Sequence, residues 1–188
     1  STSWHHLELK NVIHRYDRGA DTPPFTVGPI NLVFTRPEVV FLIGGNGSGK
    51  STLAKLITGL YPPSSGQITL DGNSIIDANR EAYRQQLSSI FADYYLIDRH
   101  LAQGQRKRLA LLTAYLEDRP VYLFDEWAAD QYDNFKTVFY TQILPELKRR
   151  KKLILAITHD DNYFHLADRI LKLENGQIAE KSIAQVYS

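Results

Sequence analysis

The chain contains neither cysteine nor methionine. The lack of cysteine excludes disulfide bridges and thiolate metal sites. The lack of methionine indicates that Ser1 is not a native start, so we interpret the sequence as a piece excised from a longer protein. No apolar run approaches the roughly 20 residues that a membrane-spanning helix needs, and no signal peptide opens the chain. We therefore expect this piece to be soluble, whatever it is attached to.

Charge of one sign is not in excess either, because 22 Lys and Arg residues face 21 Asp and Glu residues. A net charge of +1 gives no reason to expect nucleic acid or acidic lipid as the main partner. The basic run at 148–152 is typical of a solvated helix end, where cations interact favourably with the helix dipole. We predict no nucleic-acid partner. The length of 188 residues fits one domain with its own core, so residues 1–188 are treated as a single domain.

Hydrophobic patterning predicts an α/β fold with a mainly parallel central sheet and an antiparallel β portion. Continuous apolar runs at 39–43, 121–124 and 153–157, the last within a strand expected at 153–158, are typical of strands covered on both faces. Further strands are expected at 7–16, at 25–34 with a break at Gly28-Pro29, and at 67–70, 89–91, 169–173 and 177–180. Helices are expected after residue 50, with Leu60 on the apolar face, and at 79–87, 104–116, 134–150 and 162–167.

Residues 44–52 read Gly-Gly-Asn-Gly-Ser-Gly-Lys-Ser-Thr, the full GxxxxGK[ST] pattern of a P-loop, directly after a buried-strand pattern. Glycines let the backbone turn its N–H groups toward one point, where they cradle phosphates. The helix that follows adds its positive end. A glycine-rich turn that binds nothing is the alternative, and the strand-loop-helix context argues against it. The predicted nucleotide-binding residues are Gly44, Asn46, Gly47, Ser48, Gly49, Lys50, Ser51 and Thr52.

Four side chains are predicted to carry the chemistry around this loop. Lys50 can reach the β- and γ-phosphates, and the Ser51 hydroxyl can ligate Mg²⁺. Asp125 and Glu126 end a buried strand, where Asp125 would hold the metal and Glu126 would orient or deprotonate the attacking water. His159 follows another buried strand and falls on the same sheet edge, so we predict a contact to the γ-phosphate. The predicted catalytic residues are therefore Glu126, His159 and Lys50.

Together with Leu101-Ala102-Gln103-Gly104-Gln105, these motifs resemble the nucleotide-binding domain of ABC transporters. The resemblance covers nearly the whole chain: an aromatic residue before the P-loop, Walker A at 44–52, a signature-like segment at 101–105, Walker B at 121–126 and His159. Residues 125–131 and 158–164 resemble those of bacterial exporters of cyclic peptides and peptide siderophores, the pyoverdine and syringomycin type.

This resemblance implies a cofactor, partners and a location. It implies ATP with Mg²⁺ as the ligand, Tyr16 stacked on adenine, and Gly104 and Gln105 contacting ATP from a second copy in a head-to-tail dimer. It also implies a six-helix transmembrane domain on the same chain, and a position on the cytoplasmic face of the bacterial inner membrane. An ATP-hydrolysing motor domain of an exporter is the function that follows. The aromatic ring of Tyr16 could instead be a half-buried strand residue.

Three positions depart from the family pattern. Ala92 replaces the usual glutamine, Ala102 replaces the signature serine, and Tyr132 stands at the usual D-loop aspartate with Asp133 beside it. These departures keep a second hypothesis open, a nucleotide-binding regulatory or interaction module with little hydrolysis of its own.

A fourth departure is a missing length of chain. Only Arg99 and His100 separate Asp98 from Leu101, where the family has a helical subdomain of several dozen residues. Three residue steps span at most about 10 Å, which is short for a path from the γ-phosphate to the signature. Either the protein has lost this subdomain, or a disordered segment is absent from the numbered sequence. The intact flanking motifs favour the second alternative.

Overall fold

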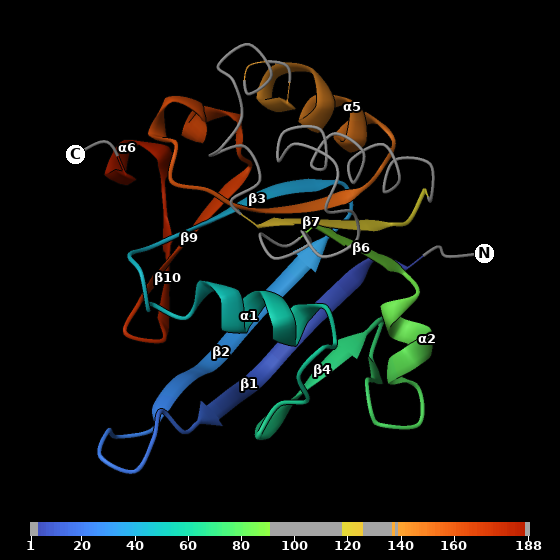
Figure 1. Ribbon diagram of the computed structural model, residues 1–188. Helices are drawn as coiled ribbons and strands as arrows, with labels where there is room; N and C mark the ends of the chain where they lie inside the picture. The colour runs from blue at the N-terminus through green and yellow to red at the C-terminus, as the bar shows by residue number, and fades with distance from the viewer. Residues whose placement is uncertain (1–3, 91–117, 126–136, 138, 187–188) are drawn as a thin grey trace, which may run out of the picture.

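In the computed structural model of the protein, two β-sheets and a set of short helices form the part of the chain that is described (Figure 1). The described residues are 4–90, 118–125, 137 and 139–186. Within these ranges no helix is both long and apolar enough to cross a bilayer.

The central sheet has six strands and is parallel except at one edge. All residues of three neighbouring inner strands, at 38–43, 153–157 and 121–125, are buried, as the continuous apolar runs predict, because side chains on both faces are covered. Only the edge pair with the C-terminal strand is antiparallel. The strand order is β10 (Gln177–Lys181), β9 (Arg169–Glu174), β3 (Glu38–Ile43), β8 (Leu153–Ile157), β7 (Val121–Asp125) and β6 (Leu87–Ile90).

The second sheet is antiparallel, in the order β2 (Phe25–Thr35), β1 (His6–Tyr16), β4 (Ser65–Leu70) and β5 (Asn73–Ser74). The α/β architecture predicted from the sequence is thereby confirmed. The expected break at Gly28-Pro29 is wrong in detail, because β2 runs through it. The pairing shifts register there instead, from Val12 opposite Ile30 to His14 opposite Val27, and such irregularities let a strand continue past a residue without an N–H.

The helices are α1 (Lys50–Ile57), α2 (Arg80–Arg84), a π-helical turn η2 (Phe139–Ile143), α5 (Leu144–Arg149), a 3₁₀ turn η3 (Asp161–Leu166) and α6 (Ile183–Val186). Three of the predicted helices differ from the structure in length or type. Helix α1 ends at Ile57, so Leu60 is not on its buried face and is 41% exposed. Helix α2 is shorter than predicted, because β6 begins already at Leu87. The helix expected at 162–167 is a 3₁₀ turn. The helix expected at 104–116 lies outside the described residues.

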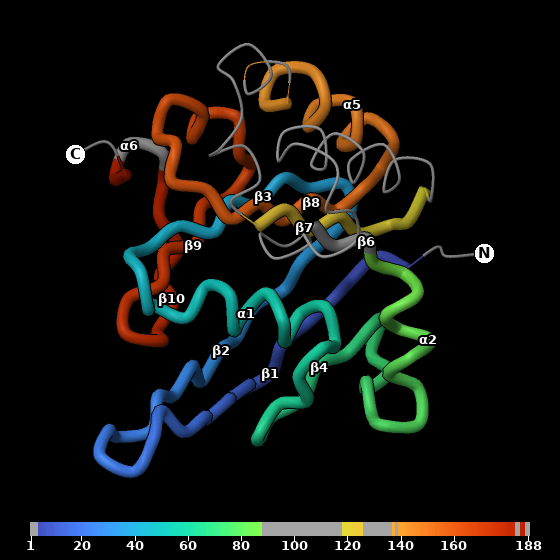
Figure 2. Tube along the Cα trace, viewed as in Figure 1, coloured from blue at the N-terminus to red at the C-terminus, as the bar shows by residue number. Residues whose placement is uncertain are grey.

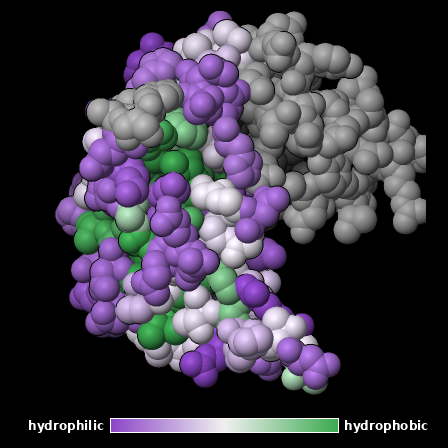
Figure 3. All heavy atoms as spheres, turned by 90° about the vertical axis from the view of Figure 1, so that its left-hand side faces the viewer, coloured by the Kyte–Doolittle hydropathy of each residue, from purple (hydrophilic) through white to green (hydrophobic). Residues whose placement is uncertain are grey.

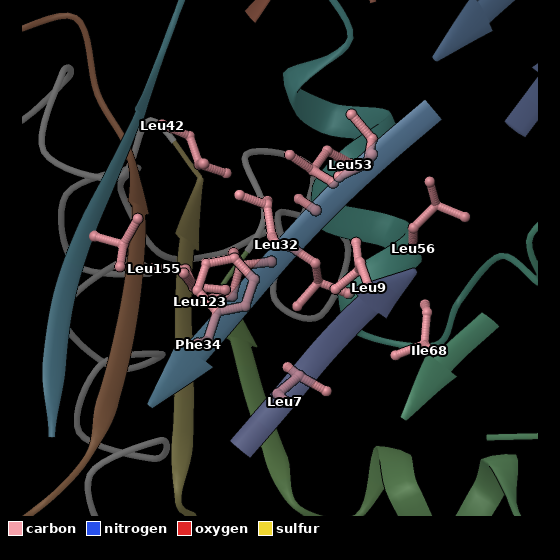
Figure 4. Close-up of a cluster of buried hydrophobic side chains, with 14 of the residues drawn as sticks. Leu7, Leu9, Leu32, Phe34, Leu42, Leu53, Leu56, Ile68, Leu123 and Leu155 are labelled. Atoms are coloured by element: carbon pink, nitrogen blue, oxygen red, sulfur yellow. The ribbon is translucent and has the colours of Figure 1, made fainter. Parts of the chain in front are cut away.

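The core divides between the two faces of the central sheet, because successive strand side chains point to opposite sides. Val40 and Leu42 of β3 face α1 and the antiparallel sheet, where Figure 4 shows Leu53 of α1 meeting leucines of several strands. Phe41, on the other face, belongs to a cluster with Tyr140 of η2. In Figures 1 and 2 the orange α5 segment lies over that face, and the green to cyan α1 lies on the opposite one.

An ionic cluster around Arg169 fastens the two sheets together. The Arg169 guanidinium donates to Glu38 Oε1 at 3.0 Å, to Glu180 Oε1 at 3.1 Å and to the carbonyl oxygen of Val33 at 2.7 Å. Glu38 is 7% exposed, so its carboxylate depends on this partner for compensation. The cluster therefore ties β2 to β3, β9 and β10.

Replacing Arg169 by alanine should lower the free energy of unfolding by about 2–3 kcal/mol, because the buried Glu38 carboxylate loses its cationic partner and keeps the Thr35 N–H as a hydrogen-bond donor. Urea denaturation followed by circular dichroism measures the change. Lys10→Ala is the matched control, because it breaks an exposed pair with Glu8 at 3.8 Å and should cost less than about 0.5 kcal/mol. Equal losses in the two variants would contradict the structural role of Arg169.

Candidate functional site

Three parallel strands end at one level, and the predicted site residues follow these ends. In the register of the central sheet Leu42 of β3 pairs with Ile157 of β8, and Ile157 also pairs with Asp125 of β7. Gly44 begins the P-loop two residues after Leu42, and His159 stands two residues after Ile157. The structure thus brings the P-loop, Asp125 and His159 to the same sheet edge. Ligands of open α/β sheets bind at such edges.

The P-loop has a shape that suits phosphate. Gly44, Gly47 and Gly49 have φ angles of 145°, 74° and 107°, which a residue with a Cβ rarely adopts. Helix α1 begins at Lys50, so the N–H groups of its first turn have no acceptor within the helix. The buried Ser48 Oγ has no hydrogen-bond partner among the described residues. Free donors around a left-handed glycine loop fit a bound phosphate group.

Lys50 lies at the centre of this arrangement. Its side chain is buried, with 6% of the residue exposed. Its Nζ donates to the Gly44 carbonyl oxygen and lies 3.2 Å from His159 Nε2. An ammonium group can only donate, so a hydrogen bond between these two atoms requires His159 Nε2 as the acceptor. Two residues that the sequence assigns to the γ-phosphate therefore meet each other across the loop.

The two predicted metal ligands differ in exposure. Asp125 is 8% exposed at the end of β7, whereas Ser51 is exposed at the start of α1. Within the described ranges no group of three or more His, Cys, Asp or Glu side chains is placed to hold a metal ion. One carboxylate and one hydroxyl fit Mg²⁺ only if phosphate oxygens and water complete its shell, which is the usual arrangement of nucleotide-bound magnesium.

The tip of the β9–β10 hairpin braces the P-loop from outside. Gly176 donates from its N–H to the Ser48 carbonyl at 2.9 Å, and its own carbonyl accepts from Gly28 N at 2.8 Å. Its φ is 77°, and a Cβ there would lie 2.1 Å from the Thr26 carbonyl oxygen. Only glycine fits this close approach. Figure 2 shows the red hairpin beside the cyan segment that carries the loop.

Tyr16 is the last residue of β1 in the antiparallel sheet. It pairs with Phe25 in the antiparallel sheet, next to Thr26, which the hairpin tip touches. Its ring lies 5.6 Å from the Phe25 ring and 6.2 Å from the His14 ring, between centroids. At 38% exposure, it can still accept another ring. The structure places Tyr16 at the end of β1, and its contact with a base stays a prediction.

A cavity of about 410 Å³ opens beside the loop, with Gly44, Gly45 and His159 in its wall. Lys172 and Lys181 also line it. Figure 3 views the molecule from the left-hand side of Figure 1, and the coloured surface there is mainly hydrophilic with interrupted hydrophobic patches.

Sequence reasoning did not find the residues that hold the His159 loop. The Tyr140 hydroxyl lies 2.7 Å from Thr158 Oγ1, which also accepts from the N–H of Asp160 at 3.1 Å. Burial raises the pKa of Tyr140 to about 12, so its hydroxyl stays protonated at any working pH. No local pattern marks Tyr140, since its role depends on a contact between residues 18 apart.

Several predicted site residues lie outside the described residues, and their roles stay predictions. They are Glu126, Gly104 and Gln105, together with the departures at Ala92, Ala102 and Tyr132 and the short connection at Arg99 and His100.

The chain is similar in sequence to ATP-binding proteins of transporters. The sequence pattern described as "ABC transporter" matches residues 27–101. The ATP-binding protein SyrD of Pseudomonas syringae pv. syringae is 45% identical over 215 aligned positions, which include 94% of this chain and 38% of SyrD. The energy-coupling factor transporter ATP-binding protein EcfA1 of Mycoplasma mobile is 29% identical, over 92% of this chain and 78% of EcfA1. The chain thus spans little more than a third of the length of SyrD.

A solved structure with a similar fold is the ATP-binding cassette MJ0796, described as a dimer in a post-hydrolysis state bound to ADP and Pi. Its TM-score is 0.84 at 20% identity, and the match covers 94% of this chain and 98% of the cassette.

The SyrD alignment is longer than the part of this chain that it contains. Since 94% of 188 residues is about 177, about 38 of the 215 aligned positions have no counterpart in this chain.

Gly44→Ala should weaken the binding of a fluorescent ATP analogue by about tenfold or more, because the loop would be forced out of shape. A Cβ at this position would lie 2.5 Å from the Leu173 carbonyl oxygen and 2.8 Å from Ser48 Oγ. Gly45→Ala is the matched control: a Cβ there meets nothing within 4 Å, and we expect affinity within about twofold of the parent. A tolerated Gly44→Ala would contradict the proposed loop geometry.

Proposed function

Because the chain belongs to the ATPase domains of ABC transporters, we propose that it binds ATP with Mg²⁺ and hydrolyses the γ-phosphate to power an exporter. The observation that supports this proposal is the contact between Lys50 Nζ and His159 Nε2, which lie 3.2 Å apart at the P-loop. The contact is at the sheet edge where β7 ends with Asp125. An ammonium group and an imidazole beside a loop rich in N–H donors are suited to bind the negatively charged triphosphate of a nucleotide.

In the proposed complex the loop N–H groups and the start of α1 hold the phosphates. Lys50 turns from the Gly44 carbonyl to the β- and γ-phosphate oxygens, which are stronger acceptors because they are charged. His159 then gains the γ-phosphate as partner in place of Lys50. The contact between them in the described structure therefore holds both side chains near their working positions.

The acidic residues would act on the metal and the water. Bound Mg²⁺ neutralises charge that develops on the phosphate oxygens. Ser51 and Asp125 would hold it, the first directly and the second through water. Glu126 follows Asp125 directly and would orient or deprotonate the attacking water. At the other end of the nucleotide, Tyr16 would stack on adenine.

The second half of the site is proposed to come from another copy of this domain. MJ0796 is described as a dimeric cassette, and the signature-like segment 101–105 would supply Gly104 and Gln105 to the partner's ATP. Helix-end N–H groups suit this task for the same reason as in the P-loop. The alanine at 102 would weaken the closed dimer, since a charge-assisted hydrogen bond contributes about 1.5–3 kcal/mol.

The transport partner is proposed to be a six-helix transmembrane domain of the same transporter, at the cytoplasmic face of the bacterial inner membrane. The likeness to SyrD over little more than a third of that protein's length supports a longer parent chain. A cyclic peptide or peptide siderophore is the proposed cargo. We also propose that many of the missing alignment positions fall between Asp98 and Leu101, where the helical subdomain is expected.

Replacing Glu126 by glutamine should keep ATP affinity within about twofold but lower the rate of phosphate release by about 10²-fold or more, because the amide cannot take a proton. Glu8→Gln, at a half-buried position of β1 in the antiparallel sheet, is the control and should hydrolyse like the parent. A Glu126→Gln variant with parental turnover would remove the assignment. A parent chain that binds ATP without turning it over would favour the regulatory module.

A further inference from the structure

Tyr140 stands at a junction of three elements behind the P-loop edge. It lies in the π-helical turn η2, a kind of turn that is rare and often found at functional sites. Its ring stacks on Tyr163 of η3, with centroids 4.3 Å apart and planes 10° from parallel. It also meets Phe41 of β3 edge-on, at 6.0 Å. Being 3% exposed, the ring has almost no freedom to move.

The one polar atom of this ring is aimed at the end of β8. The Tyr140 hydroxyl lies 2.7 Å from Thr158 Oγ1 in a buried contact. Thr158 is itself 3% exposed. Its Oγ1 accepts from the Asp160 N–H at 3.1 Å, and the Asp160 carboxylate in turn accepts from Asn162 N at 3.2 Å. The hydroxyl pair therefore fixes the backbone on both sides of His159.

We propose that Tyr140 is a positioning residue for His159, acting through Thr158 to hold the imidazole at the P-loop edge where a γ-phosphate would bind. This inference rests on the proposed function, since it names what holds one group of that site. The Tyr140 and Thr158 hydroxyls share a hydrogen bond, and Thr158 Oγ1 accepts from the Asp160 N–H. With both neighbours of His159 held, the side chain projects toward Lys50, 3.2 Å away.

The same hydrogen bond connects His159 to η2 and to the helix that follows it. The π-turn η2 leads directly into α5, which packs on the face of the sheet opposite to α1. A displacement of η2 would therefore reach His159 through a single hydrogen bond. Tyr140 also packs against Phe41 of β3, so its ring contacts the strand that leads into the P-loop.

The test is the affinity of the chain for ATP and for ADP, measured by calorimetry in EDTA so that no ATP is consumed. Tyr140→Phe keeps the ring and removes the hydroxyl. It should weaken ATP binding by about fivefold, the value of one hydrogen bond, and leave ADP binding within about twofold, because only ATP carries the γ-phosphate. Tyr163→Phe is the matched control. It removes a hydroxyl from the other ring of the same stack, where the partner is Thr137 at 3.1 Å, and should leave the affinity ratio unchanged.

A cycle with His159→Ala separates positioning from a purely structural role. In that background Tyr140→Phe should have no further effect on ATP affinity, because the group on which it acts is gone. Equal weakening of ATP and ADP, an unchanged ratio, or an effect that persists in the His159→Ala background would overturn the inference.

Two substitutions at Thr158 guard against failure of Tyr140→Phe to fold. Thr158→Ser keeps the hydroxyl and should retain the parental ratio, whereas Thr158→Val should lower ATP affinity as Tyr140→Phe does. If both behave alike, the inference is wrong. A parent chain that binds neither nucleotide overturns the proposed function as well. A parent that binds both, with variants of unchanged ratio, overturns this inference alone.

Discussion

The common register of three parallel strands is the constraint on which the rest of the site depends. Since Leu42, Ile157 and Asp125 lie side by side in the ladder, the segments that follow β3 and β8 leave the sheet at the same height as the end of β7. Each strand is buried on both faces, so a shift of register would expose apolar side chains and is strongly disfavoured. Burial of the three strands therefore fixes the relative positions of Lys50, His159 and Asp125, which are distant in sequence.

These three groups also show why the edge is suited to a charged ligand. Lys50 and Asp125 are both nearly buried, and burial of charge is costly without compensation. The glycine loop between β3 and α1 supplies donors but no charge, and the buried Ser48 hydroxyl still lacks an acceptor among the described residues. An anion with several oxygens would satisfy the free donors of the loop, and a divalent cation bound to that anion would interact favourably with the Asp125 carboxylate.

The sequence was sufficient to predict the central strands and the P-loop, because apolar runs and the glycine pattern are local signals. Glycines 44, 47 and 49 adopt the positive φ angles that the pattern demands. The end of α1 before Leu60 and the continuity of β2 were predicted wrongly, since they depend on packing against other segments. Tyr140 and Gly176 were missed for the same reason: neither belongs to a short motif, and each acts through a partner far along the chain.

The bridge that Gly176 makes between Gly28 and Ser48 has a consequence for the order in which the protein is made. Gly28 leaves the ribosome well before the tip of the β9–β10 hairpin, because it precedes Gly176 by 148 residues in the chain. Because chains fold from the N-terminus as they emerge, the antiparallel sheet can form while the P-loop still lacks its outer support. Only a nascent chain whose β9–β10 hairpin has emerged can form this contact, so the braced P-loop is completed after the antiparallel sheet.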